Sequence, residues 1–251
     1  MKACVILRPS ASKRLIARGV ASLPLVKRAM TSSTVVITLG TTNAAVAEEL
    51  LGSAIDRGTF AAGFVSDRWN LNARIAETKE IVLRSGTLVD VESDKLLEEL
   101  GAGDVVIKGG NAIDPWGTVG VLLGSTTGGT VGRYLSRALA RGVDIIIPIG
   151  LEKAIHASIS EIAACLGAGR IDRCMGLPAG MQPLIGRVVT EIDALETLFA
   201  VEAMQIAAGG IGSGAGSVSL LLEGERDAVN VAFDYVASLA DEPETPLEGM
   251  R

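Results

Sequence analysis

The chain has 251 residues, of which 48% are hydrophobic and 21% are charged, so it carries enough apolar material for a folded core and is not a disordered chain. Its length fits one large domain or two small ones, at about 100–200 residues per domain. The net charge is −6 and aromatic residues make up only 3%, which disfavours both phosphate-backbone attraction and base stacking. We therefore expect no nucleic-acid partner.

Cysteine, histidine and apolar segments exclude further classes. Cys4, Cys165 and Cys174 are scattered without a CxxC pair, and His156 is the single histidine, so we expect reduced thiols, no disulfide framework and no metal site. The apolar run at the N-terminus ends at Arg8, too early for a signal peptide, and each long uncharged stretch is interrupted by Gly, Ser or Thr. These features predict a cytoplasmic protein without a membrane partner.

The first two-thirds of the chain alternate between apolar segments and segments with helical periodicity. The expected strands are Ala3–Leu7, Thr34–Leu39, Thr59–Phe64, Thr78–Ser85, Asp104–Ile107, Val119–Leu123 and Val143–Ile149. The expected helices are Ser10–Ala29 with a break at Pro24, Ala44–Leu51, Asp94–Leu100, Tyr134–Arg141 and Glu152–Leu166. Because most of these strands are continuously apolar, the pattern predicts a three-layer, Rossmann-like α/β domain with a parallel sheet covered on both faces.

After about residue 170 the order of the elements changes. The expected strands are Arg187–Thr190, Val201–Ala207 and Ser217–Leu222, and the expected helices are Asp193–Phe199 and Asp227–Leu239. This order is typical of a small α+β layer of the ferredoxin-like type. We therefore expect a ligand-binding α/β domain at residues 1–168, a smaller α+β lobe at 169–240 and a flexible charged tail at 241–251.

A turn of small residues, Gly40, Thr41, Thr42 and Asn43, separates an expected strand from an expected helix. The backbone N–H groups of such a turn, the helix dipole and the threonine hydroxyls together form an anion site. The alternative is an ordinary helix N-cap made by Thr or Asn. Open α/β sheets bind ligands outside the carboxyl ends of their strands, so we expect this turn to bind a phosphate.

A second loop, KGGNAID, runs from Lys108 to Asp114 after another expected strand. Gly109 and Gly110 let a ligand approach the backbone closely, and Asn111 adds an amide. The catalytic candidates are Asp114 as a general base and Lys108 as its cationic neighbour. The alternative is that Asp114 opens a turn before the proline that follows it.

A third loop precedes the expected helix Tyr134–Arg141 and repeats the same chemistry. Its candidate ligand-binding residues are Thr127, Gly128, Gly129, Thr130 and Arg133. An arginine beside a Gly/Thr turn suits a phosphate or carboxylate group, whereas the alternative is a tight turn with a surface arginine.

Motifs for nucleotide cofactors are incomplete, so we expect no cofactor. The loop Gly209–Gly216 (GGIGSGAG) contains no complete GxGxxG and precedes a strand rather than a helix, which favours a flexible hairpin. The loop at Gly124–Arg133 lacks the lysine of a P-loop. Glu152 and Lys153 follow the strand Val143–Ile149 and are interpreted as a helix cap and a solvated pair.

The order of these loops resembles the NagB/RpiA/CoA-transferase-like superfamily, which includes sugar-phosphate isomerases and CoA transferases. The similar part covers roughly residues 10–165, in which Gly40–Asn43 looks like the phosphate loop of that group and Lys108–Asp114 looks like its Asp-Gly-Ala-Asp loop. The Gly-rich stretch, helix and strand at Gly124–Ile149 follow in the same order. The resemblance, together with the apolar content, implies a homodimer or a higher homo-oligomer.

Two departures from this family pattern bear on activity. Lys108 and Asn111 stand where the isomerases have aspartates, and no glutamate has the context of the CoA-transferase nucleophile. The expected function is therefore binding of a phosphorylated or CoA-linked small metabolite, either as an isomerase-like or transferase-like enzyme or as a non-catalytic metabolite-binding or regulatory protein. Whether the chain is an enzyme stays open at this point.

Overall fold

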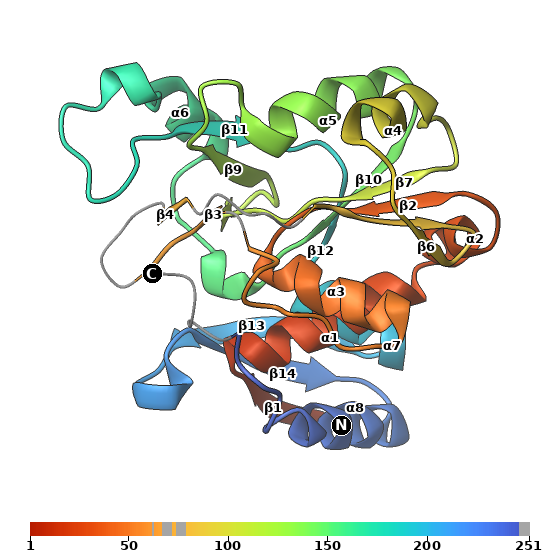
Figure 1. Cartoon of the computed structure of the whole chain (residues 1–251). Helices are drawn as coiled ribbons and strands as arrows, with labels where there is room; N and C mark the ends of the chain where they lie inside the picture. The colour runs from red at the N-terminus through yellow and green to blue at the C-terminus, as the bar shows by residue number, and fades with distance from the viewer. Residues whose placement is uncertain (62, 67–71, 74–78, 246–251) are drawn as a thin grey trace.

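The computed structural model describes residues 1–61, 63–66, 72–73 and 79–245, and shows a mixed α/β protein with eight α-helices in this part of the chain (Figure 1). Its central sheet has six strands in the order β12-β10-β7-β2-β5-β6. The parallel strands are β2 (Thr34–Ile37), β7 (Val105–Ile107), β10 (Asp144–Pro148) and β12 (Arg187–Val189). The antiparallel strands are β5 (Ile81–Arg84) and β6 (Thr87–Val89), so the expectation of an all-parallel sheet is wrong at this edge.

Helices cover both faces of the central sheet (Figure 1). One face carries α1 (Pro9–Ser22), α3 (Thr41–Leu51) and α7 (Glu191–Phe199), and the other carries α4 (Ser93–Glu99) and α5 (Gly129–Ala140). Successive side chains of a strand point to opposite faces, so Val35 and Ile37 enter the core beneath α1 and α3, whereas Val36 enters the core beneath α4 and α5. This burial on both faces explains why the strands read as continuous apolar runs.

The predicted break in the first long helix is present. α1 ends at Ser22 and α2 (Pro24–Ser32) begins at Pro24, with Leu23 in an extended conformation between them. Proline lacks the N–H that would continue α1, and it is well tolerated in the first turn of a new helix.

A second, three-stranded antiparallel sheet has the order β1-β14-β13. Its strands are β1 (Lys2–Leu7), β13 (Glu202–Gly209) and β14 (Ser217–Glu223), and α8 (Arg226–Ser238) follows. The inward side chains of this sheet share one core with α1, α7 and α8, and α1 and α7 lie between the two sheets (Figure 1).

The two sheets do not divide the chain at residue 168. The first strand, β1, pairs with β14 of the second sheet, whereas β12 lies beyond residue 168 and pairs with β10 of the central sheet. Both pairings join segments that are distant in sequence, and the order of elements along the chain carries no signal for them.

The remaining elements surround the carboxyl edge of the central sheet. A third sheet joins β8 (Ala112–Ile113), β9 (Val119–Leu123) and β11 (Gly180–Pro183), and β3 (Gly63–Phe64) pairs with β4 (Asn72–Ala73). The short helical elements are η1 (Leu151–Lys153), α6 (Ile159–Cys165), η2 (Ala168–Arg170) and η3 (Gly212–Gly214). The single helix expected at Glu152–Leu166 is therefore two, because Ile155 N–H donates a hydrogen bond to Ile113 across the break.

Buried ion pairs hold the chain after α8. Glu242 accepts hydrogen bonds from Arg14 and from Arg57, at 3.1 and 2.7 Å, and both arginines also bind Glu48 of α3. Residues 241–245, the first part of the expected tail, thus lie against α1 and α3. Residues 246–251 of that tail lie outside the described residues.

We predict that Gly19→Ala destabilises the protein by about 1–3 kcal/mol, the usual range for overpacking. An added Cβ would lie 2.6 Å from the Cβ and 2.9 Å from the Cα of Ala194, so α1 and α7 would have to move apart. Urea unfolding measures the loss. Gly101→Ala is the matched control, because nothing lies within 4 Å of an added Cβ there. Equal stabilities of the two variants would contradict close contact of α1 and α7.

Candidate functional site

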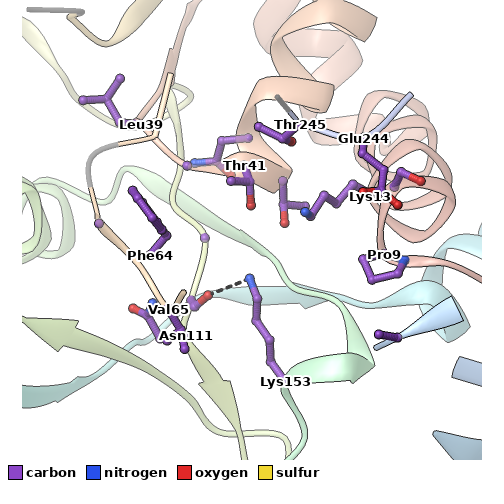
Figure 2. Close-up of a pocket in the computed structure, with 18 of the residues that line it drawn as sticks. Pro9, Lys13, Leu39, Thr41, Phe64, Val65, Asn111, Lys153, Glu244 and Thr245 are labelled. Atoms are coloured by element: carbon purple, nitrogen blue, oxygen red, sulfur yellow. Dashed lines mark hydrogen bonds between the residues drawn. The ribbon is translucent and has the colours of Figure 1, made fainter. Parts of the chain in front are cut away.

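A cavity of about 500 Å³ opens where the parallel strands β2, β7 and β10 reach their carboxyl ends (Figure 2). Its walls come from the first turns of α1 and α3, strand β3, the loops after β7 and β10, the β13–β14 connection and the segment after α8. The volume is in the range of small-molecule sites, about 300–1,000 Å³. The cavity therefore lies where the sequence predicts a ligand.

The first turn of α3 forms one wall. Gly40 is the N-cap residue and no side chain caps the helix, so the first N–H groups of α3 have no intrahelical acceptor. Thr41 and Thr42 line the cavity, and the hydroxyl oxygen of Thr42 is buried without a hydrogen-bond partner in the described structure. This turn has the donors and the dipole of an anion site, as its sequence predicts.

Asn43 joins this turn to the neighbouring strand. Its side-chain Nδ2 donates to the backbone oxygen of Thr38 at 2.8 Å and to that of Ile107 at 3.2 Å, and the residue is fully buried. One amide thereby fixes the start of α3 against the ends of β2 and β7. Its Oδ1 lies beside Gly109, 3.5 Å from where a Cβ would be, and has no hydrogen-bond partner in the described structure.

Three lysines from separate elements line the cavity: Lys13 of α1, Lys108 after β7 and Lys153 of η1. Figure 2 shows the side chains of Lys13 and Lys153 reaching into it from different walls. The Nζ atoms of Lys108 and Lys153 donate to the backbone oxygens of Gly109 and Gly110, at 3.0 and 3.1 Å. Within the described residues, none of the three lysines forms an ion pair.

The pKa values of two of these lysines are lowered. Burial, and then the charge of Lys153, lower the pKa of Lys108 to about 8. Burial and Lys153 likewise lower the pKa of Lys13, and the carboxylate of Glu152 opposes this shift. A negative charge brought close to these lysines would favour their charged forms.

A buried carboxyl group lies close to this cluster. Glu191, at the start of α7, is fully buried and accepts a hydrogen bond from Leu151 N–H at 2.9 Å. Burial, and then the neighbouring charge of Glu152, raise the pKa of Glu191 to about 7. Glu191 can therefore hold a proton near neutral pH, next to the backbone that carries Lys153.

The Gly-rich loop Gly209–Gly216 contributes to the cavity. Gly212, Ser213 and Ala215 line it, and Gly210 has a positive φ of 104°. A Cβ at Gly210 would lie 2.0 Å from the backbone oxygen of Gly214, so this tight connection requires glycine there. The expected hairpin connection is thus also a wall of the candidate site.

The structure gathers two of the three predicted loops at the cavity. Gly40, Thr41, Thr42 and Asn43 line it, and so do Lys108, Gly109, Gly110 and Asn111. Asn111 also accepts a hydrogen bond from Leu122 N–H at 3.0 Å, which ties this loop to β9.

Asp114 is not among the described residues that line the cavity. Its carboxylate accepts hydrogen bonds from the backbone N–H groups of Trp116, Thr118 and Ile159, at 3.0, 2.8 and 3.1 Å. Burial raises the pKa of Asp114, but these backbone hydrogen bonds outweigh it and hold the pKa below its ordinary value. The structure thus uses Asp114 to close the β8–β9 turn and to begin α6, in keeping with the turn interpretation.

The third predicted loop lies outside the cavity wall. Thr127 is exposed and lies just before α5, whereas Gly128 and Gly129 at its start are half-buried; the hydroxyls of Thr127 and Ser125 are hydrogen-bonded at 3.0 Å. Arg133 forms an ion pair with Glu80 at 2.6 Å. Thr130 borders a separate, much smaller gap next to Lys108 and Tyr134.

The lining residues that sequence reasoning missed include Ser10, Lys13 and the loop residue Ser213. It also interpreted Lys153 as part of a solvated pair. No local pattern marks these residues, because they reach the cavity only through the packing of α1 and of the second sheet.

In the part of the chain that the structure describes, no three His, Cys, Asp or Glu side chains are grouped to hold a metal ion. Among these residues, no helix combines the length and the apolar character needed to cross a membrane. A scan against protein-family models finds no match, and searches of curated proteins and of solved structures find no significant similarity.

We predict that Glu191→Gln changes how stability depends on pH. The folded protein holds the Glu191 proton up to about pH 7, whereas the unfolded chain releases it near the ordinary value of 4.5. The unfolding free energy of the wild type should therefore fall as the pH rises from 4.5 to 7, by up to about 1.4 kcal/mol per pKa unit. The variant should lack this decrease.

Urea unfolding from pH 4.5 to 8 measures the effect. Glu196→Gln, at an exposed position on the same helix, is the control and should follow the wild type. If Glu191→Gln also runs parallel to the wild type, Glu191 does not hold a proton at neutral pH.

Proposed function

We propose that this protein binds a phosphorylated small metabolite in the cavity at the carboxyl ends of β2, β7 and β10. The observation that carries the proposal is the meeting of Lys13, Lys108 and Lys153 with the uncapped first turn of α3. None of these lysines forms an ion pair within the described residues, and a phosphate group would offset their mutual repulsion.

We infer that the central sheet and its helices form a Rossmann-like layer structure and that the second sheet with α7 and α8 forms a ferredoxin-like lobe. The proposed relation to the NagB/RpiA/CoA-transferase-like superfamily is supported by the loops Gly40–Asn43 and Lys108–Asn111 meeting at one cavity. A cavity of about 500 Å³ is large enough for a sugar phosphate, whereas it would hold only part of a CoA ester.

Metabolite binding is favoured over an aspartate-based isomerisation. Asp114 is committed to three backbone hydrogen bonds, and Lys108 and Asn111 are not carboxylates. The second candidate function is catalysis with Lys108 as the proton-accepting group, because a lysine with a pKa of about 8 is partly neutral at physiological pH.

We predict that Lys108→Met lowers the affinity for ribose 5-phosphate by at least about tenfold. The same change should raise the melting temperature of the ligand-free protein at pH 7, because it removes a desolvated charge. Isothermal titration calorimetry and thermal melts measure the two effects. Lys95→Met is the matched control, because Lys95 lies on the surface of α4 with an exposed side chain.

The pH dependence provides a second readout. A phosphate monoester is already fully ionised above about pH 7. Affinity for ribose 5-phosphate should therefore fall between pH 7.5 and 9.5 as Lys108 loses its proton, and Lys108→Arg should flatten this decrease. Unchanged affinity in Lys108→Met, Lys153→Met and Thr42→Val would remove the proposed site.

A further inference from the structure

A second helix N-terminus meets the same cavity. Pro9, Ser10 and Lys13 of α1 line it, on a different wall from the first turn of α3. No side chain caps α1, and Pro9 at its first position has no N–H, so the first free donors are the N–H groups of Ser10 and Ala11. With α3, two helices of 14 and 11 residues thus begin at one cavity.

Each of these helix starts carries a buried, unpartnered hydroxyl group. Ser10 is 5% exposed and Thr42 is 3% exposed, and neither hydroxyl oxygen has a hydrogen-bond partner within the described structure. A buried polar atom without a partner requires an explanation, and at a cavity wall a bound ligand or an ordered water supplies one. Each of the two helix starts therefore has a buried hydroxyl group that lacks a hydrogen-bond partner in the described structure.

The described residues of the cavity wall carry three lysines and one carboxylate, so positive charge is in excess there. Lys13, Lys108 and Lys153 face it, together with the carboxylate-bearing Glu244, whose nearest ion-pair partner in the described residues is Arg8 at 3.8 Å. Figure 2 shows Lys13 extending from α1 in the direction of Thr41, between the two helix starts. A single phosphate at α3 would leave the α1 start unoccupied.

The Gly-rich connection between β13 and β14 adds polar groups next to α1. Ser213 lines the cavity, and Gly216, with φ of 79°, packs so closely that an added Cβ would lie 3.1 Å from Pro9. The α1 start and this loop therefore form adjacent parts of the cavity wall.

We propose, on the basis of the proposed function, that the metabolite carries two separate anionic groups, at least one of them a phosphate. One group binds at the start of α3 with Thr42, and the second binds at the start of α1 with Ser10. Lys13 lies between them and contacts both groups. The substrate class is a small bisphosphate or a phosphorylated carboxylate, not a simple monophosphate.

The test compares matched ligand pairs of increasing separation by isothermal titration calorimetry at constant ionic strength. The pairs are phosphate and pyrophosphate, ribulose 5-phosphate and ribulose 1,5-bisphosphate, and fructose 6-phosphate and fructose 1,6-bisphosphate. In at least one pair the doubly anionic member should bind about tenfold or more tightly.

Variants at the two helix starts test whether the second anionic group binds at the start of α1. Ser10→Ala should weaken the doubly anionic ligand by about threefold to tenfold and leave the monophosphate unchanged, whereas Thr42→Val should weaken both. Ser10→Asp places a carboxylate at the start of α1, where it also suits the helix dipole, and should abolish the advantage of the second anionic group. Thermal melts of each variant confirm that it is folded.

The outcomes separate the two proposals. If no member of any pair binds, the proposed function fails. If monophosphates bind but no doubly anionic ligand binds more tightly than its singly anionic counterpart, only the proposal of a second anionic group is overturned. A tighter doubly anionic ligand that is insensitive to both Ser10→Ala and Ser10→Asp would also overturn it, because the second group would then bind elsewhere.

Discussion

The in-register parallel pairing of β2, β7 and β10 is the constraint on which the cavity depends. Ile37 pairs with Ile107, and Ile107 pairs with Ile146, after which β10 continues to Pro148, so the carboxyl ends of the three strands lie at one edge. The chain after each strand must then leave the sheet at the same edge, which brings the starts of three loops together. Asn43 fixes two of these exits, because its amide donates to backbone oxygens at the ends of both β2 and β7. The positions of Gly40 and Lys108 follow from this geometry.

The same geometry brings buried ionisable groups close together. Lys108 and Lys153 are held near each other by backbone hydrogen bonds to Gly109 and Gly110, and burial together with their mutual repulsion depresses the pKa of Lys108. Close to them, Glu191 is kept partly protonated near neutral pH by burial and by Glu152. Under the proposed function, a complementary anion would favour the charged forms of these lysines on binding, and shifted pKa values of this kind are common at functional sites.

The sequence predicts the central layer and two loops of the site, because local rules govern them. Continuous apolar runs mark buried parallel strands, Pro24 ends a helix, and a Gly/Thr turn after a strand marks a helix start. The local sequence pattern does not predict the features that depend on pairing between distant segments. The partner of β12 and the pairing of β1 with β14, whose first pair joins Lys2 to Glu223, have no signal in the local pattern. Lys13 is likewise unremarkable in sequence, because only the packing of α1 brings it to the cavity.

The second sheet is therefore part of the candidate site and not an appended lobe. Strand β1 ends at Leu7 within that sheet, and α1 begins at Pro9, so the pairing of β1 with β14 sets where the first turn of α1 meets the cavity. The β13–β14 connection of the same sheet supplies a further part of the cavity wall through Ser213. A ligand that contacts the starts of both α1 and α3 would bridge the two sheets. Such a ligand should stabilise them as one cooperative unit, whereas a ligand held at α3 alone would act on the central sheet.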